Sequence, residues 1–334
     1  GVARDLLAAI NFKKYSGAWS KLIKLPKAIK SDFKLETNIK IEIEDPKVCF
    51  RYTGVVIKNI KVEESPNWLK SKLEAIGVKS INNVVDTTNF ILHDLGQPLH
   101  AFDLNEITNR VIKVRTAKKN TSFTTLDDNE RKLHENDLMI CNDLKEMCIA
   151  GVFGGKNSGV KESTTEIFIE SALFDPVSIR KTAKRHGLNT DASFRYERGV
   201  DPNMVIPALV KASEIIVEIA GGKICSEIFN AHPTKSSDNS FRIDFESIRK
   251  LCGFSLENDL MVELLNYLDI KVIDKNDNNA KVTVPAYRND VTRQADIAEE
   301  ILRIYGYNNI EIPLKINSSP TFTNIKNKVT LQQL

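Results

Sequence analysis

The sequence predicts an α+β protein with two folded units: a larger mixed α/β unit over residues 40–233 and a small helix-rich α+β unit over residues 241–313. Between Val111 and Ile149, short apolar runs alternate with polar turns, which is typical of antiparallel hairpins. Other segments have helical spacing, and the polar run from Pro233 to Ser240 separates the two units.

The composition is that of a globular protein and excludes several classes. The 334 residues are too many for one ordinary core, and a net charge of +3 limits any nucleic-acid contact to a local surface. Five scattered cysteines without a CxxC pair argue against a disulfide framework and a zinc site, and indicate a reducing, cytoplasmic setting. No apolar run approaches the ~18 to 20 residues that span a bilayer, and no signal-peptide pattern is present, so no membrane association is expected.

The amino-terminal end is interpreted as the tail of a helix over residues 4–12, followed by a lysine-rich connector. Because the sequence opens in mid-pattern without an initiator Met, we expect it to be part of a longer protein.

The first half of the larger unit predicts two strands and two helices. Alternating apolar residues from Lys40 to Val62 indicate the strands, and PNWLKSKLEAIGV indicates an amphipathic helix closed by Gly77. The segment INNVVDTTNFILHDLGQPLHAFD then predicts a mostly apolar helix that ends at Gly96. Asn89 lies in that helix, and His100 follows just after it.

A glycine loop, GVFGGKNSG, follows the predicted hairpins. It lacks the Walker A order and the Gly-Lys-Ser/Thr ending, so it is a weak match to a nucleotide-binding loop. Its glycines, which include Gly151 and Gly154, leave open a close approach of the backbone to some other ligand.

Glu170 is placed by the sequence at the end of a short buried strand, Ile167–Ile169, where the chain gives way to Ser171. A carboxylate in such a place needs a hydrogen-bonded partner to offset its desolvation. A structural glutamate and a ligand-binding glutamate both fit this pattern.

A helix is predicted from Pro176 to Gly187, and its basic residues either face solvent or contact a phosphate backbone. The small residues that follow, among them Thr190 and Ala192, leave room for a ligand or cap the next helix. A further long helix is predicted from about Asn203 to Ile219.

In the small unit, the last predicted helix has an apolar stripe that includes Ile297 and Ile301. Three carboxylates share the adjoining face, and a fourth lies upstream: Asp296, Glu299, Glu300 and Asp290. Their spacing fits either a Mg²⁺ site, which uses a few carboxylates and retains water ligands, or a solvated acidic face.

The chain resembles a known family in several long segments. NNVVDTTNFILHDLGQPLHAFD, IAGVFGG, FIESALFDP and TDASFRYERGVDP, in this order, are similar to the editing domain in the beta subunit of bacterial phenylalanine–tRNA ligase. RNDVTRQADIAEEILRIYGYNNI resembles the domain that follows in that subunit. The similarity extends over nearly the whole chain. It implies that residues 1–39 are the end of the family's amino-terminal structural domain with its linker, and that residues 314–334 are the start of its catalytic-like domain.

The resemblance implies the partners and cofactors of this family. Its members join phenylalanine to tRNA(Phe) with ATP and Mg²⁺ in a tetramer of two alpha and two beta subunits, and the synthetic site lies in the alpha subunit. This chain alone is therefore not expected to bind ATP or to aminoacylate tRNA. The family's amino-terminal oligonucleotide-binding-type domain and carboxy-terminal anticodon-binding domain are absent from the sequence, so we expect weak tRNA binding in isolation.

The resemblance also implies the site residues. In this family the beta subunit hydrolyses tyrosine wrongly attached to tRNA(Phe). The expected catalytic residues are Asn89, His100 and Thr190, and the expected substrate-binding residues are Gly151, Gly154, Glu170 and Ala192. The positions that correspond to the family's magnesium ligands, shared with the alpha subunit, are Asp290, Asp296, Glu299 and Glu300.

These residue types suit the expected chemistry. A phenylalanine pocket rejects the extra hydroxyl of tyrosine only ~100-fold, so a second site must remove the errors. Glu170 is expected to accept the phenolic hydrogen bond, while loop amides, Thr190 and Asn89 donate to the developing oxyanion. His100 either orients water or the terminal ribose, or makes a structural contact.

Two other functions compete with editing. The first is a non-catalytic scaffold that only binds tRNA or a partner subunit. The second is a metal-dependent hydrolase centred on the acidic helix, which is disfavoured because no His or Cys joins the acidic cluster.

Overall fold

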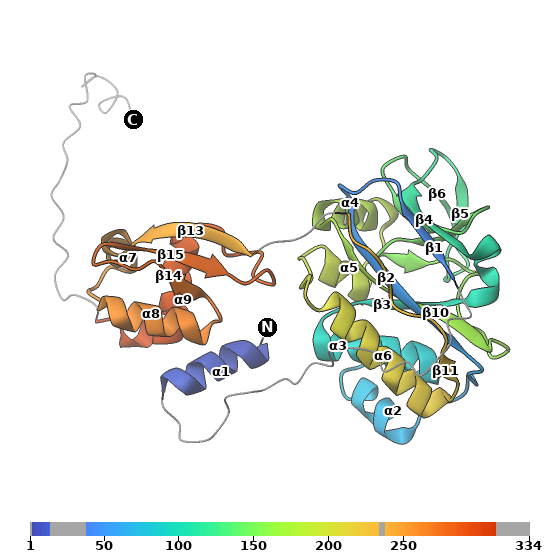
Figure 1. Cartoon of the computed structure of the whole chain (residues 1–334), viewed down its shortest axis with the longest axis horizontal. Coiled ribbons are helices and arrows are strands. Elements are labelled where there is room, and N and C mark those ends of the chain that lie inside the picture. Colours follow the sequence, from blue (N-terminus) through green and yellow to red (C-terminus); the bar gives the residue numbers. More distant parts are fainter. Residues whose placement is uncertain (1, 14–37, 234–237, 312–334) are drawn as a thin grey trace, which may run out of the picture. The chain divides into compact units, whose positions relative to one another are not determined.

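The structure is a computed structural model that describes residues 2–13, 38–233 and 238–311 (Figure 1). The connector around Pro26, the expected domain start at 314–334 and residues 234–237 of the polar run lie outside these ranges. Both units combine helices with strands, and the strand pairs of the larger unit are mainly antiparallel, so the α+β prediction is confirmed. No helix within the described ranges is long and apolar enough to cross a membrane.

The chain divides into two compact units that are not two consecutive segments. The larger unit takes in residues 38–233, 238–241 and 282–292. The smaller takes in residues 2–13, 242–281 and 293–311.

The larger unit contains two main sheets and a small hairpin. Its strands are β1 (Lys40–Ile43), β2 (Cys49–Lys58), β3 (Leu99–Asp103), β4 (Val111–Thr116), β5 (Ser122–Thr124), β6 (Glu130–Lys132), β7 (Leu138–Cys141), β8 (Glu146–Ile149), β9 (Phe153–Gly154), β10 (Glu166–Phe174), β11 (Lys223–Ile224) and β12 (Phe229–Ala231). One sheet has the order β1-β4-β7-β8-β9 and the other β11-β2-β10-β3, with β12 also paired to β2. The antiparallel β4–β7 and β7–β8 pairs confirm the hairpins predicted between Val111 and Ile149.

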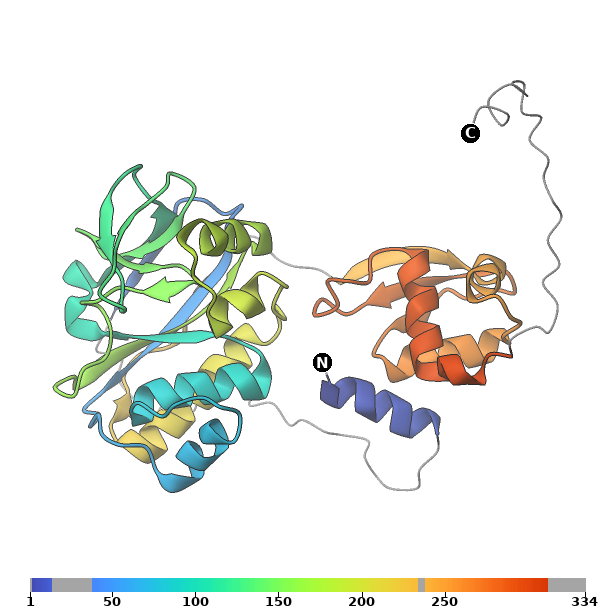
Figure 2. The same ribbon diagram turned by 180° about the vertical axis from the view of Figure 1, so that it is seen from behind.

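Helices cover one face of the β11-β2-β10-β3 sheet. The helices of this unit are α2 (Asn67–Glu74), α3 (Asn83–Leu95), α4 (Pro176–His186), α5 (Asp191–Tyr196) and α6 (Val205–Ala220). Both views show α3 and α6 side by side against the sheet (Figures 1 and 2). The other face of this sheet contributes to a core shared with the β1-β4-β7-β8-β9 sheet.

The alternation of side chains along β10 assigns its residues to these two cores. Ile167 and Ile169 pack in the cluster that includes α6, whereas Phe168 and Ala172 pack between the sheets. Because strand side chains alternate with a period of two, Glu170 points to the same side as Phe168 and Ala172. This carboxyl group therefore lies in a largely apolar layer and is only 4% exposed.

The predicted end of the strand at Glu170 is wrong. β10 continues to Phe174, so Glu170 lies in its middle, paired with Gly54 on β2 and His100 on β3. The strand continues through Ser171 because its buried hydroxyl finds a hydrogen-bond partner in the folded chain: it donates to the Val205 carbonyl at 2.8 Å. Such a long-range partner is invisible in the local sequence.

Glycine marks the helix ends much as predicted. Gly96 and Gly187 follow α3 and α4 with φ of +77° and +64°, a left-handed conformation that L side chains rarely adopt. The prediction for α2 was too long, since this helix ends at Glu74 and Gly77 belongs to the turn beyond it.

The smaller unit packs helices beside a three-stranded sheet. Its elements are α1 (Val2–Phe12), β13 (Asn239–Asp244), α7 (Phe245–Cys252), α8 (Asn258–Tyr267), β14 (Lys271–Ile273), β15 (Asn279–Val284) and α9 (Gln294–Tyr305), with sheet order β13-β15-β14. The predicted stripe residues Ile297 and Ile301 are buried. Helix α1 packs against α8 and α9: Asp5 pairs with Arg303 at 3.2 Å, and Phe12 lies 6.2 Å from Tyr305 between ring centroids.

Candidate functional site

A cavity of about 460 Å³ opens in the larger unit, a size typical of small-ligand sites. It is bounded by α3, the start of β3, the glycine loop, the middle of β10 and the start of α5. All seven residues expected in the catalytic and substrate-binding sets line it: Asn89, His100, Gly151, Gly154, Glu170, Thr190 and Ala192. The fold thus brings together residues that are more than 100 positions apart in the sequence.

The two cavity glycines allow other side chains to approach closely. Gly151 has φ of +66°, and a Cβ there would lie 2.8 Å from Tyr196 Cδ2. A Cβ on Gly154 would lie 2.7 Å from Leu126 Cδ1 and 3.2 Å from His100 Cε1. Larger residues at either position would displace the cavity wall.

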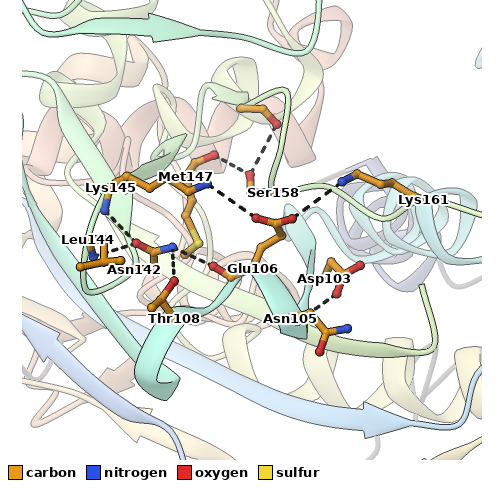
Figure 3. Close-up of polar contacts among 11 residues, drawn as sticks. Asp103, Asn105, Glu106, Thr108, Asn142, Leu144, Lys145, Met147, Ser158 and Lys161 are labelled. Carbon is orange, nitrogen blue, oxygen red and sulfur yellow. Dashed lines mark hydrogen bonds and ion pairs between the residues drawn. The ribbon is translucent and has the colours of Figure 1, made fainter. Parts of the chain in front are cut away.

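Side chains behind the glycine loop hold it in place (Figure 3). The Ser158 hydroxyl donates to the Met147 carbonyl at 2.6 Å. The Glu106 carboxylate lies between the ammonium groups of Lys145 and Lys161, at 3.7 and 3.8 Å (Figure 3). Ser158 therefore ties the loop to β8, and Lys161, which follows the loop, pairs with the turn after β3.

Glu170 supplies a buried carboxyl group to the cavity. Its Oε2 accepts a hydrogen bond from the Tyr52 hydroxyl at 3.2 Å. Burial raises the pKa of Glu170 from 4.5 to about 8, and the Tyr52 hydrogen bond opposes that rise. The group is therefore largely protonated at pH 7 while no ligand stabilises its charge.

His100 lies directly across from Glu170 on β3. The residue as a whole is partly exposed, but its ring nitrogen Nε2 is buried and has no hydrogen-bond partner among the described residues. Burial lowers the pKa of His100 from 6.5 to about 4, so the imidazole is neutral at pH 7. A neutral ring with an unpaired nitrogen can bind a hydroxyl group or a water molecule.

Thr190 caps α5 and ties it to the glycine loop. Its hydroxyl accepts from the Ser193 amide at 3.1 Å and donates to the Val152 carbonyl at 2.9 Å. The hydroxyl proton is thus already used, and this geometry favours an anchoring role for Thr190 over the expected donation to an oxyanion. Asn89 differs, because its side-chain amide makes no hydrogen bond with another described residue and lines the cavity.

Several cavity residues were not predicted. On α3 they follow the helical spacing that leads from Asn89, so its periodicity could have revealed them: Val85, Thr88 and Leu92. Cys148, Tyr196 and Leu126 also line the cavity, but they come from separate elements and carry no local signal.

Three of the four acidic residues expected to hold Mg²⁺, Asp296, Glu299 and Glu300, lie on α9. Asp296 accepts hydrogen bonds from Arg293 at the start of α9, and Glu300 pairs with Arg303 at 2.6 Å. Glu299 is exposed, whereas Glu300 is 5% exposed, so the two side chains differ in environment. Within the described ranges, no three His, Cys, Asp or Glu side chains lie close enough together to hold a metal ion, so these residues do not fit Mg²⁺ by themselves.

Comparisons with known proteins agree with the two-unit architecture. A family model described as the B3/4 domain matches residues 48–221, just over half of the chain. The chain belongs to the B3/4 domain family. A model described as the tRNA synthetase B5 domain matches residues 241–307.

Curated relatives of this B3/4 protein confirm the resemblance to bacterial phenylalanine–tRNA ligase beta subunits. The chain is 47% identical over 324 residues to that subunit of Bacteroides fragilis strain YCH46. The aligned region covers 96% of this chain and 39% of the relative. The subunit of Porphyromonas gingivalis is 45% identical over 320 residues, covering 96% and 38%. The chain thus spans about two fifths of the length of these relatives.

Among solved structures, the chain matches an amino-terminal fragment of the phenylalanyl-tRNA synthetase beta subunit from Pyrococcus horikoshii. The match covers 85% of this chain and 78% of that fragment, with a TM-score of 0.40 and 19% identity.

Proposed function

We propose that this chain is part of the beta subunit of a phenylalanine–tRNA ligase, and that its larger unit hydrolyses tyrosine wrongly attached to tRNA(Phe). The main support is the cavity itself, because the seven residues expected from the resemblance all line it. Its one buried carboxyl group, Glu170, suits the recognition of a single phenolic hydroxyl.

Glu170 reads the amino-acid side chain. Its Oε2 is held by Tyr52, which leaves Oε1 for the ligand. A phenolic hydroxyl that donates to this oxygen stabilises the ionised carboxylate, whereas a phenylalanine ring leaves it buried without a ligand partner. Tyrosine esters are therefore hydrolysed in preference to phenylalanine esters.

Hydrolysis needs a placed water molecule and a donor for the oxyanion. The water oxygen attacks the ester carbonyl, the bond to the ribose oxygen breaks, and a proton from the water ends on that ribose oxygen. His100, with its low pKa, orients the water or ribose rather than acting as a strong base. The Asn89 amide, which has no other partner among the described residues, donates to the developing oxyanion.

The tRNA contacts the exposed basic side of α4. Arg180, Lys181 and Lys184 are exposed there and make no ion pair within the described part of the chain, while Arg185 pairs with Asp137. Such residues suit contacts to phosphates. In the whole enzyme this chain works with the alpha subunit, which uses ATP and Mg²⁺ for aminoacylation in the reducing cytoplasm; no step of the editing reaction passes through the metal.

Deacylation assays test this function. The chain is incubated at high concentration with Tyr-tRNA(Phe) and Phe-tRNA(Phe), as wild type, Glu170→Ala and the control Glu166→Ala, which changes the same strand outside the cavity. We expect hydrolysis of the tyrosine ester by wild type and the control. Glu170→Ala should slow it and reduce discrimination by ~1.5 to 3 kcal/mol, the range for a hydrogen bond to a charged group.

Two outcomes would contradict the proposal. No hydrolysis by folded wild-type protein, with tRNA still bound, would favour the non-catalytic scaffold. An equal loss of both rates in Glu170→Ala would assign Glu170 to the hydrolytic step or the fold instead of to specificity.

A further inference from the structure

Tyr52 lies behind Glu170, on the side away from the cavity. The strand register places Gly54 directly opposite Glu170 and Tyr52 opposite Ala172, so Tyr52 reaches Glu170 as a diagonal neighbour. Tyr52 is fully buried and is not among the residues that line the cavity. Its hydroxyl therefore does not line the ligand site itself, and its hydrogen bond goes to Glu170.

The Tyr52 hydroxyl holds one specific oxygen of Glu170. It donates to Oε2 at 3.2 Å, while Oε1 makes no hydrogen bond with another described residue. A second buried tyrosine nearby, Tyr196, directs its hydroxyl elsewhere, to the backbone carbonyls of Ala172 at 3.2 Å and Pro98 at 3.4 Å. Tyr52 is thus the side chain in the described part of the chain that fixes the orientation of this carboxyl group.

We propose that Tyr52 is a positioning residue for substrate discrimination: it holds Glu170 Oε2 so that Oε1 faces the ligand hydroxyl. This inference rests on the proposed function, because it assumes that Glu170 reads a phenol. Without the Tyr52 hydroxyl, the carboxyl group can rotate, and the hydrogen bond that favours its ionised form is lost.

The surroundings of Glu170 make Tyr52 important for its charge state. The titratable groups around it are Tyr52 and Cys49 of β2, His100 of β3, Cys148 of β8 and Tyr196 of α5. Burial raises the pKa of each tyrosine and cysteine and lowers that of the histidine, so all are uncharged at pH 7. None can replace the Tyr52 hydrogen bond with an ion pair.

The test compares Tyr52→Phe with Thr53→Val in the full chain. Thr53 is the matched control, since its buried hydroxyl donates to the Ser171 carbonyl at 2.6 Å across the same strand pair, whereas Glu170 is hydrogen-bonded by Tyr52. One readout is the ratio of Tyr-tRNA(Phe) to Phe-tRNA(Phe) deacylation rates. The other is the titration midpoint of the Glu170 carboxyl carbon, followed by NMR with labelled glutamate and assigned with Glu170→Gln.

We expect Tyr52→Phe to lower the rate ratio about tenfold and to move the Glu170 titration midpoint to higher pH, because a hydrogen bond to a charged group is lost. Thr53→Val should change neither. In a Glu170→Gln background, Tyr52→Phe should have a much smaller effect on the ratio, since it acts through the carboxylate. Should Tyr52→Phe not fold, Tyr52→Met, which also lacks the hydroxyl, is measured in the same way.

Three results would overturn the inference: an unchanged titration midpoint, an unchanged rate ratio in a chain that does discriminate, or the same loss in the Glu170→Gln background as in wild type. If wild type hydrolyses neither ester, the proposed function fails separately. The titration, together with the binding of free tyrosine against free phenylalanine, then decides the role of Tyr52.

Discussion

Phe168 occupies space that glycine at position 54 provides: a Cβ on Gly54 would lie 2.0 Å from Phe168 Cζ. Gly54 also pairs with Glu170, two residues along β10 from Phe168. The contact therefore fixes the packing of the layer in which the cavity carboxyl group lies, and it links the stability of the fold to the geometry of the site.

Gly54→Ala should destabilise the larger unit by about 1–3 kcal/mol, because the added methyl group forces the Phe168 ring out of its place. The free energy of unfolding, measured in urea, checks this. Phe168→Leu in the same chain should recover part of the loss, because the smaller side chain relieves the overlap. If the double variant lost the sum of the two single effects, the overlap would not be the cause.

The stability of the larger unit should depend on pH through Glu170. The unfolded carboxyl has a pKa near 4.5 and the folded one about 8, so between these values the folded state binds one more proton. The stabilisation is complete below pH 4.5 and is lost as pH rises through 8. His100, whose pKa is lowered from 6.5 to about 4, makes the free energy of unfolding rise with pH between pH 4 and 6.5. Between pH 6.5 and 8, Glu170 is therefore the one of these two groups that changes the stability.

In that window the free energy of unfolding should fall with a slope of about 1.4 kcal/mol per pH unit from this group, roughly 2 kcal/mol in all. Glu170→Gln should remove this slope. Urea unfolding of both proteins at several pH values measures it, with Glu166→Gln as the control on the same strand. Equal slopes in wild type and Glu170→Gln would show that Glu170 is ionised in the folded protein at pH 7.

Because Ala8 is buried, the packing of α1 should be necessary for the stability of the smaller unit. Ala8 is 0% exposed, so Ala8→Asp buries a charge without a prepared partner and should cost more than about 2 kcal/mol. Ala3→Asp, the same change at an exposed position in the first turn, should be nearly neutral. Hydrogen exchange of the amides in α8 and α9 measures the stability of this unit selectively. Equal protection of these amides in Ala8→Asp and Ala3→Asp would contradict the packing of α1 against them.

Glu299 offers the cleanest test of the metal-linked assembly that the resemblance implies. Asp296 and Glu300 already contact arginines, so changing them disturbs α9 itself, whereas Glu299 is exposed. Glu299→Gln should weaken Mg²⁺-dependent association with the alpha subunit and leave deacylation intact. The binding affinity is measured with and without Mg²⁺, with Glu74→Gln as an exposed control. If Glu299→Gln bound the alpha subunit as tightly as wild type, with and without Mg²⁺, Glu299 would not take part in a metal-linked assembly.

Local sequence predicted the features that depend on neighbouring residues. The ends of α3 and α4 were found because Gly96 and Gly187 adopt left-handed conformations that other residues disfavour. Local sequence marked Glu170 and the glycine loop as candidates for ligand binding, but only the resemblance grouped them with Asn89 in one site, because these residues meet through tertiary packing and share no local pattern.

One error arose where a distant contact overrides local preference. A carboxylate suggested the end of a strand at Glu170, but the partner that stabilises it, Tyr52, is 118 residues away. The Mg²⁺ positions stay a prediction: Asp296 and Glu300 have metal-ligand spacing, and arginines three residues away, Arg293 and Arg303, also contact them. Side-chain spacing alone does not distinguish a cation site from such local ion pairs.

Because α1 packs with residues 242–281 and 293–311, the larger unit is inserted within the smaller one along the chain. The B5-matching sequence at residues 241–307 is therefore not the whole of its structural unit, since a helix encoded more than 200 residues earlier completes the packing. An expression boundary drawn at residue 241 would remove that helix and expose the surfaces of α8 and α9 that it covers. A shorter protein that retains α1 through a designed loop in place of residues 14–237 would preserve them.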